Sequence, residues 1–367
     1  MKIKIGQKNL IESLKIVSRA VSGQNQLPVL GNILIRAENK KVYFSATNLE
    51  ISISTSTDAE IKNEGAITVP AKIFTSYISL LQKDEDINLE IDGNADLKIK
   101  SKSSKTKIKG IPADEFPSIA RVENGAKINL DAKIFRDSVS KVAFSAQENS
   151  SRPILAGVFL AIEKKELRMA ATDSYRLSEK ILELENSLEK ISSLIPVRAI
   201  FEADRLIGDA EKISITISEN QAMFLIGNTE LTTRLIEGQF PNYQQIIPQK
   251  KLTTVQIDRS ELEMAVRRVS IFAKENNQHM KLEFLGEKTC QISTNATEIG
   301  EEQASISAKI SGENSSISLN ADYFLDALSA LGKEEKIEIE LSGKMSPAVL
   351  KIPKNKNFVH LIMPLKI

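Results

Sequence analysis

The sequence repeats one pattern three times, and this repeat constrains the fold more than any other feature. An apolar stripe at helical spacing occurs near the start and returns twice, each time about 125 residues later. The three stripes are Leu10, Leu14 and Val17; Phe135, Val139 and Val142; and Leu262, Val266 and Val269. Each stripe indicates an amphipathic helix whose apolar side packs on a core.

A second helix and two landmarks return in the same register. The second helix has apolar positions at Phe74, Ile78 and Leu81, at Ala199, Ala203 and Leu206, and at Phe324, Leu328 and Leu331. Its start is marked by residue types that suit the first turn or cap of a helix, namely Pro70, Pro196 and Asn320. The landmarks are a polar turn at Thr47-Asn48, Thr172-Asp173 and Thr294-Asn295, and the pairs Phe116-Pro117, Phe240-Pro241 and Met363-Pro364. Four features in one order indicate three copies of one unit.

Short runs at 87–91, 213–217 and 337–341 alternate apolar and polar residues. Alternation with period two indicates strands that have one buried face. Each unit is therefore predicted to be α+β, with two helices packed on antiparallel sheet. Gly125 and the run 249–251 interrupt the apolar pattern, so we predict domains at 1–124, 125–250 and 251–367.

The charge balance and the single cysteine narrow the class of protein. Lys and Arg number 49 against 48 Asp and Glu, which excludes a bulk polycation but permits a basic surface on one side. Cys290 cannot form an intrachain disulfide, which agrees with a reducing compartment. No stretch approaches the roughly 20 apolar residues of a membrane span. We therefore expect a cytoplasmic protein that makes no membrane contact.

Candidates for catalysis or metal binding are few. The chain has two histidines, His279 and His360, and lacks the HExxH, CxxC and phosphate-binding glycine motifs. Asp173 beside Arg176 could form an acid–base site, but asparagine occupies its place in the other two repeats, which favours a structural turn. The alternative class, a hydrolase or sugar-binding β-rich protein, would need a carboxylate pair across a cleft. No such pair stands out, so we predict a protein without enzymatic activity, cofactor or metal.

The whole chain resembles the bacterial DNA polymerase III β subunit family, the sliding clamps. The resemblance is carried by four segments on the threefold repeat: Leu27 to Asn32, Ala171 to Leu177, Glu237 to Tyr243, and Met363 to Ile367. It implies a head-to-tail homodimer whose six domains form a closed ring around duplex DNA, without sequence specificity. The implied partners are the DNA polymerase III catalytic subunit, the clamp loader and other proteins with clamp-binding motifs.

The resemblance also implies a cleft between the second and third domains, where partners insert short motifs rich in Gln, Leu and Phe. Matched by motif, the cleft residues are Leu155, Thr172, Ser174, Tyr175, Arg176, Leu177, Pro241, Ile246, Met363, Pro364 and Leu365. An adaptable methionine beside leucines suits such a groove. The same apolar residues could equally be ordinary core, because buried leucines need no ligand.

Basic residues on the expected helices agree with a surface that contacts phosphates and reads no sequence. The helices at 8–20, 71–83, 133–144 and 259–274 each carry two more basic than acidic residues, whereas those at 197–209 and 320–332 are net acidic. The resemblance further implies that loops 22–26 and 147–152 reach toward the duplex. The candidate DNA contacts are Gln24, Lys72, Asn149, Arg152 and Arg198. Alternatively, the lysines merely solvate the helices.

For the joint between subunits, the sequence offers two unlike surfaces of opposite charge. Residues 98–109 are rich in lysine, and we expect Lys98, Lys100 and Lys102 on one face of a strand. We expect these lysines to face an acidic cluster in the third domain of the other subunit. Apolar residues lie beside the lysines and beside the acidic cluster. The candidate interface residues are Lys100, Lys102, Lys105, Ile108, Ile271, Phe272, Glu298, Glu301 and Glu302. Lysines on an edge strand could instead only block unwanted pairing.

Overall fold

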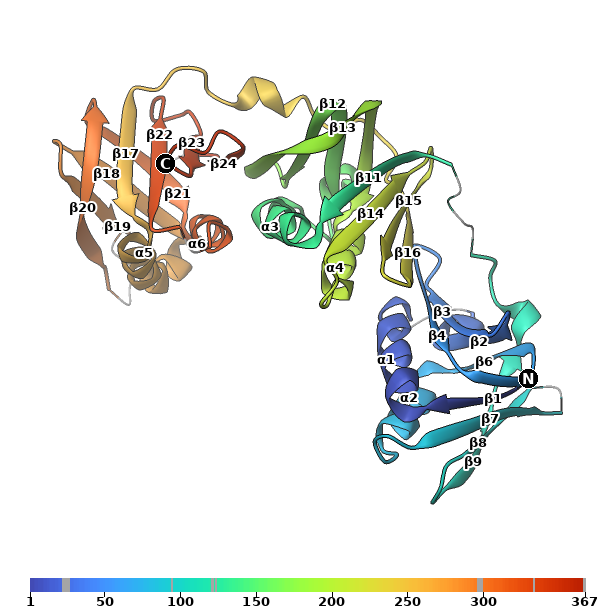
Figure 1. Cartoon of the computed structure of the whole chain (residues 1–367). Coiled ribbons are helices and arrows are strands. Elements are labelled where there is room, and N and C mark those ends of the chain that lie inside the picture. The colour runs from blue at the N-terminus through green and yellow to red at the C-terminus, as the bar shows by residue number, and fades with distance from the viewer. Residues whose placement is uncertain are drawn as a thin grey trace. The chain divides into compact units, whose positions relative to one another are not determined.

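The computed structural model describes residues 1–21, 27–93, 95–119, 122, 124–295, 300–332 and 334–365. Within this part, helices and antiparallel strands follow one another in an order that repeats three times (Figure 1). No helix in the described ranges is both long and apolar enough to cross a membrane. The predicted α+β class, with helices packed on antiparallel sheet, is confirmed.

Among the residues that the structure describes, each repeat holds two α-helices. The first repeat contains β1 (Lys2–Gly6), α1 (Gln7–Val17), β2 (Asn32–Glu38), β3 (Lys41–Thr47), β4 (Ile51–Asp58), β5 (Glu60–Asn63), β6 (Gly65–Pro70), α2 (Ala71–Ser79), β7 (Asp86–Asp92), β8 (Asp96–Lys100), β9 (Lys105–Lys109) and β10 (Ile111–Pro112). The second contains β11 (Ala126–Asp131), α3 (Ala132–Val142), β12 (Gly157–Thr172), β13 (Arg176–Pro196), α4 (Val197–Leu206), β14 (Lys212–Ile217), β15 (Gln221–Ile226) and β16 (Thr229–Arg234). The third contains β17 (Thr253–Asp258), α5 (Arg259–Ala273), β18 (His279–Leu285), β19 (Thr289–Ser293), β20 (Gln303–Gly312), β21 (Ser315–Asn320), α6 (Ala321–Ala330), β22 (Lys336–Leu341), β23 (Ala348–Lys351) and β24 (Phe358–Ile362).

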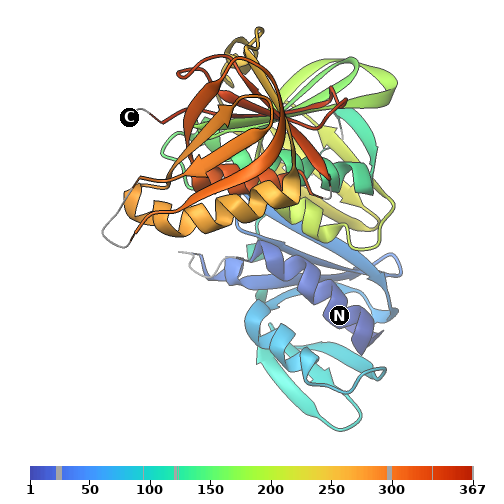
Figure 2. The same cartoon turned by 90° about the vertical axis from the view of Figure 1, so that its left-hand side faces the viewer.

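The helices form where the sequence pattern predicts them, because their apolar stripes are buried. Leu10 and Leu14 in the first repeat and Leu262 and Val266 in the third are completely buried. In the third repeat, α5 and α6 lie side by side on one face of the sheet (Figures 1 and 2). The predicted cap is also present, since the Asn320 side chain accepts hydrogen bonds from two backbone N–H groups in the first turn of α6.

Strand pairing ties neighbouring repeats together. The sheets have the orders β5-β1-β7-β8-β9, β10-β6-β2-β3-β4-β16-β15-β14-β11, and β12-β13-β24-β23-β22-β17-β20-β19-β18-β21. The second sheet joins the first repeat to the second through β4 and β16, and the third sheet joins the second repeat to the third through β13 and β24. Both joints are antiparallel, so hydrogen bonds seal them in the same way.

By their internal contacts the residues form two compact units, 1–135 with 201–235 and 136–200 with 236–367. The division passes through the second repeat because its strands pair with both neighbours. Strands β11 and β14 to β16 belong to the first unit, and β12 and β13 to the second. The domain boundaries near 124 and 250 therefore stay a prediction from the repeat.

Several predicted elements end earlier in the structure. Helix α2 ends at Ser79 rather than near residue 83, and α4 ends at Leu206, before Gly208 in the left-handed region. The prediction that Lys102 shares a strand face with Lys98 and Lys100 is wrong, because β8 ends at Lys100. A tight turn closed by a backbone hydrogen bond from Ser101 to Ser104 takes Lys102 out of the strand.

Candidate functional site

The turn at 172–176 is fixed by its own side chains. Thr172 Oγ1 donates to the carbonyl of Arg176 at 2.7 Å, and Asp173 Oδ1 accepts the N–H groups of Tyr175 and Arg176, both at 2.9 Å. Ser174 takes φ 79°, in the left-handed region. These bonds make Asp173 part of a structural turn, as predicted, rather than an acid–base site.

The first repeat builds the same turn from different residues. Asn48 Oδ1 accepts the N–H groups of Glu50 and Ile51, and Thr47 Oγ1 donates to the carbonyl of Ile51. Leu49 takes φ 76°, in the place of Ser174. The two joints between repeats are thus built on one backbone plan.

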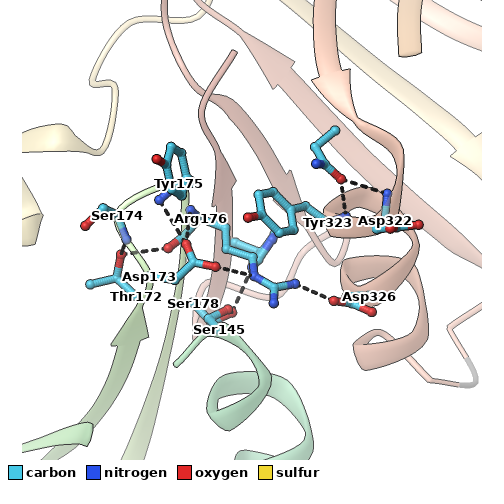
Figure 3. A network of polar contacts seen from close by, with 12 residues as sticks. Ser145, Thr172, Asp173, Ser174, Tyr175, Arg176, Ser178, Asp322, Tyr323 and Asp326 are labelled. Atoms are coloured by element: carbon cyan, nitrogen blue, oxygen red, sulfur yellow. Dashed lines mark hydrogen bonds and ion pairs between the residues drawn. The ribbon is translucent and has the colours of Figure 1, made fainter. Parts of the chain in front are cut away.

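Arg176 is enclosed on several sides (Figure 3). Its Nε donates to Asp173 Oδ2 at 3.0 Å and its Nη1 to Asp326 Oδ2 at 2.5 Å. The guanidinium carbon lies 4.5 Å from the ring centroid of Tyr323 and 5.4 Å from that of Phe144. Such cation–π contacts reinforce the ion pairs. The site therefore joins a turn of the second repeat to helix α6 of the third.

The C-terminal strand lies beside this turn. In the register of β13 and β24, Leu177 pairs with Leu361, and the N–H of Met363 donates to the carbonyl of Tyr175 at 2.8 Å. The N–H of Leu365 donates to the carbonyl of Ser318 at 2.8 Å, so both flanking repeats hold the end of the chain. Lys366 and Ile367 lie outside the described residues.

The predicted pocket residues divide into a buried floor and an exposed rim. Leu155 and Leu177 are 5% and 1% exposed, and Thr172 is also buried. Tyr175 is 61%, Ile246 46% and Met363 38% exposed. The other members surround these positions, with Ser174 and Pro241 exposed and Pro364 and Leu365 half-buried.

One apolar cluster connects several of these positions. Leu177 and Leu361 pack in it with Phe240 and Tyr243, which flank Pro241. Phe159 stacks on Phe240 with ring centroids 4.9 Å apart. The structure thus brings the turn, the C-terminal strand and the segment at 240–247 together, as the motif match predicted.

The sequence analysis did not predict the contribution of helix α6 to the site. Tyr323 and Asp326 lie on α6, three residues apart, and both contact Arg176. The Tyr323 ring also stacks on Tyr175, with centroids 6.4 Å apart. The spacing of Tyr323 and Asp326 fits one helix face, but nothing in the sequence shows which residue the face meets.

Beneath Arg176 lies a buried hydroxyl–imidazole chain that the sequence did not reveal. His360 Nδ1 and Ser178 Oγ are 2.8 Å apart, and Ser178 Oγ and Ser145 Oγ are also 2.8 Å apart. His360 Nε2 has no hydrogen-bond partner among the described residues. Burial, and secondly the nearby Arg176 charge, lower the pKa of His360 to about 3. The imidazole is therefore neutral near pH 7.

The equivalent joint between the first and second repeats has a polar floor. Ser52 pairs with Thr232 there, where the second joint pairs Leu177 with Leu361. A hollow of about 720 Å³ lies over this face, lined by hydroxyls such as Ser45 and Ser54, which bond to each other at 2.8 Å. The hollow also has Leu34 and Phe116 in its lining, but Ser52 and Thr232 stand where the second joint has the Leu177–Leu361 pair.

Ion pairs occupy many of the basic side chains on the helices. Glu263 pairs with both Arg259 and Arg267, and Arg268 pairs with Glu302 at 3.4 Å. Glu202 forms ion pairs with Arg205 and Arg19 in the first unit. Two arginines of the 259–274 helix thus contact a glutamate of the same helix, and Glu302 from outside the helix offsets one of its two excess positive charges.

The cations that form no ion pair with another described residue lie mainly in the first two repeats. They are exposed and include Lys8, Lys15, Lys72, Lys133 and Arg198. Asn149 and Arg152 are exposed in the loop that follows α3, as predicted. Gln24 lies outside the described residues.

The lysine-rich hairpin and the acidic cluster of the third repeat are only partly available for a subunit contact. Lys107 pairs with Asp96 at 2.6 Å, whereas Lys100 and Lys105 lie opposite each other across the hairpin. Glu302 is engaged by Arg268 of its own chain, Glu301 is exposed, and Glu298 lies outside the described residues.

The apolar candidates also differ in exposure. Ile108 is 8% exposed, so most of its side chain packs inside the first repeat, while Ile271 is 61% exposed and Phe272 half-buried. A pair of apolar residues that the sequence analysis did not predict is more accessible: Ile73 on α2 is 59% exposed and Leu80, just after the helix, is 84% exposed. We call this pair the α2 stripe. Its neighbour Tyr77 bonds to Ser104 in the β8–β9 turn, which places the stripe beside the hairpin.

Three repeated α+β domains, with antiparallel sheets that run across the joints, define the DNA-clamp class of proteins. Models of the N-terminal, central and C-terminal domains of the DNA polymerase III beta subunit match residues 1–120, 129–242 and 244–366. The chain belongs to the DNA polymerase III beta subunit family, whose members are clamps rather than enzymes.

Similar proteins match over the full length. The beta sliding clamp of Synechococcus elongatus is 32% identical, with 100% of both chains covered, and that of Staphylococcus aureus is 28% identical, covering 100% of this chain and 99% of the relative. The solved sliding clamp of Bacillus subtilis has a TM-score of 0.96 at 28% identity, covering 100% of this chain and 99% of that one. A clamp of Pseudomonas aeruginosa solved bound to griselimycin has a TM-score of 0.95 at 25% identity, with 100% of both chains covered.

Proposed function

We propose that this chain encircles duplex DNA as a homodimeric ring and tethers the replicative polymerase and other DNA-handling proteins to it. The observation that carries the proposal is the full-length threefold repeat, sealed at both internal joints by β-pairing. A closed ring of such repeats holds DNA by topology and needs no sequence readout. The working compartment is then the cytoplasm.

The internal joints suggest how two copies close the ring. At each joint one strand of a repeat pairs with a terminal strand of the next, β4 with β16 and β13 with β24. Two strand edges remain open among the described residues. The first half of β20 pairs only with β19, and β9 pairs only with β8. We infer that β9 of one copy pairs with β20 of the other, which is a heterologous contact that two copies can close.

Apolar residues lie beside these open edges and supply the stronger contribution. Burying a Phe or Ile side chain contributes about 1.5–3 kcal/mol, whereas an exposed ion pair contributes about 0.2–1 kcal/mol. We infer that Ile271 and Phe272 meet the α2 stripe of Ile73 and Leu80. The charged residues then determine the register of the contact and contribute less to its affinity. They are Lys100, Lys102 and Lys105 on one side and Glu301 on the other.

We infer the DNA-facing surface from the exposed cations that form no ion pair with another described residue. Exposed lysines on α1, α2 and α3, with Arg198 on α4 and Arg152 in its loop, attract phosphates without reading bases. The arginines of α5 are already paired with Glu263 and Glu302. We therefore infer that the first two repeats contribute most of the DNA contact.

Charge reversal at Lys72, Arg152 and Arg198 is expected to weaken binding to a short duplex and flatten its salt dependence. Each lost phosphate contact reduces the slope of log affinity against log salt by about 0.9. Fluorescence anisotropy across a salt series measures both quantities. A matched control reverses Lys164, Lys165 and Lys354, which are exposed on strands and turns rather than helices. Equal slopes for the two triple variants would refute the assignment.

We further propose that partners insert a short motif into the pocket formed by the 172–177 turn, the 240–247 segment and the C-terminal residues. Its support is the exposed rim of Tyr175, Ile246 and Met363 above buried leucines. An apolar pocket with a few fixed polar groups suits a linear peptide. At the first joint, the polar pair Ser52 and Thr232 replaces the buried leucine pair Leu177 and Leu361.

Deletion of residues 365–367 is expected to abolish binding of the pentapeptide Gln-Leu-Ser-Leu-Phe while the dimer stays intact. The deletion removes one wall of the pocket together with the hydrogen bond from Leu365 to Ser318. Isothermal titration with the peptide, alongside sedimentation of the variant, tests this. Unchanged peptide affinity would rule out the pocket.

A further inference from the structure

Arg176 is the polar centre of the pocket rim, and two carboxylates of different origin hold it (Figure 3). Asp173 belongs to the same turn, and its other oxygen already accepts the turn's N–H groups. Asp326 lies on α6, 150 residues away, and pairs with Nη1 at 2.5 Å. The Arg176 side chain is 11% exposed, whereas that of Asp326 is 51% exposed.

Asp326 has no other ion-pair partner in the described part of the chain, so it contributes to the site through Arg176 alone. Its pairing holds the guanidinium over the Tyr323 ring, at 4.5 Å from the centroid. Tyr323 in turn stacks on Tyr175, the most exposed residue of the rim. This series of contacts, from Asp326 through Arg176 and Tyr323 to Tyr175, thus connects the pocket rim to helix α6 of the third repeat.

We propose that Asp326 is a positioning residue for the partner pocket, which it shapes by holding Arg176 and the Tyr175–Tyr323 stack in place. The proposal rests on the pocket proposed above. Without the Asp326 carboxylate, Arg176 keeps only the local Asp173 pair, and its guanidinium gains freedom that peptide binding must remove. The cost of ordering that side chain then weakens binding.

The test is a double-mutant cycle with the fluorescent pentapeptide Gln-Leu-Ser-Leu-Phe and the full-length dimer. Asp326→Asn is expected to weaken peptide affinity about fivefold, near the upper end for a partly exposed ion pair. Asp326→Glu keeps the charge and is expected to restore most of the affinity. In an Arg176→Gln background, Asp326→Asn should have no further effect, because the two residues act as one unit.

Asp322→Asn is the matched control, since it removes the same charge from the first turn of the same helix. It is expected to leave peptide affinity unchanged. If native protein binds the peptide and Asp326→Asn binds it equally well, the positioning role is wrong. The role is also wrong if the Asp326→Asn effect persists in the Arg176→Gln background. If native protein fails to bind the peptide, the pocket itself is wrongly assigned.

Discussion

Replacing Ile271 and Phe272 by alanine is expected to convert the dimer into monomers. Each side chain contributes about 1.5–3 kcal/mol when its apolar surface is buried, and a symmetric ring repeats the loss at both joints. Together these losses exceed what the surrounding ion pairs can supply. Sedimentation velocity at micromolar concentration measures the change in mass.

The control for this variant is Met345→Ala, which removes a large side chain that is 65% exposed in a loop of the same repeat. It is expected to leave the dimer intact. Leu80→Ala, just after α2, tests the opposite surface and is expected to weaken the dimer as well. If the Ile271 and Phe272 double variant stays dimeric while Leu80→Ala dissociates, the third-repeat side of the joint lies elsewhere.

A fall in pH below 6.5 is expected to destabilise the unit that contains His360. The unfolded imidazole has its ordinary pKa near 6.5, whereas burial lowers the folded pKa to about 3. The unfolded state therefore binds the proton first, and stability present above pH 6.5 is lost toward pH 3. The loss approaches about 1.4 kcal/mol per pH unit, or about 2 kcal/mol between pH 6.5 and 5.0.

Denaturant unfolding at pH 6.5 and 5.0 measures this difference. His360→Phe is expected to remove most of the pH dependence, because the phenyl ring carries no proton to bind. His279→Gln serves as the control, since these two are the only histidines of the chain. A native protein whose stability is equal at the two pH values would contradict a buried neutral imidazole.

The repeat allowed much of the fold to be predicted, because helical and strand periodicity depend on local pattern. Leu10, Leu262 and their equivalents could be assigned to buried helix faces from spacing alone. The predicted ends of helices and strands were less accurate, since α2 ends at Ser79 and the strand of the lysine-rich hairpin ends before Lys102. Those endpoints depend on turn hydrogen bonds that no periodicity reveals.

The site was predictable only where residues adjoin in sequence. The turn from Thr172 to Leu177 and the terminal Met363 could be matched by motif, and the structure brings them together. The pairing of Arg176 with Asp326, and that of His360 with Ser178, spans well over a hundred residues. Charge counting gave the net charge of the 259–274 helix but not its ion pairs, because the sequence does not show that Glu263 contacts two arginines.

Retention on closed and cut DNA tests most directly whether this chain encircles the duplex. The chain is assembled on nicked circular duplex, separated from free protein by gel filtration, and followed before and after a single restriction cut. A ring that encircles DNA stays on the circle at high salt and slides off the ends once the circle is cut. Its free form should have twice the 40.6 kDa mass of one chain. Equal retention on circular and linear DNA would show that the protein does not encircle the duplex.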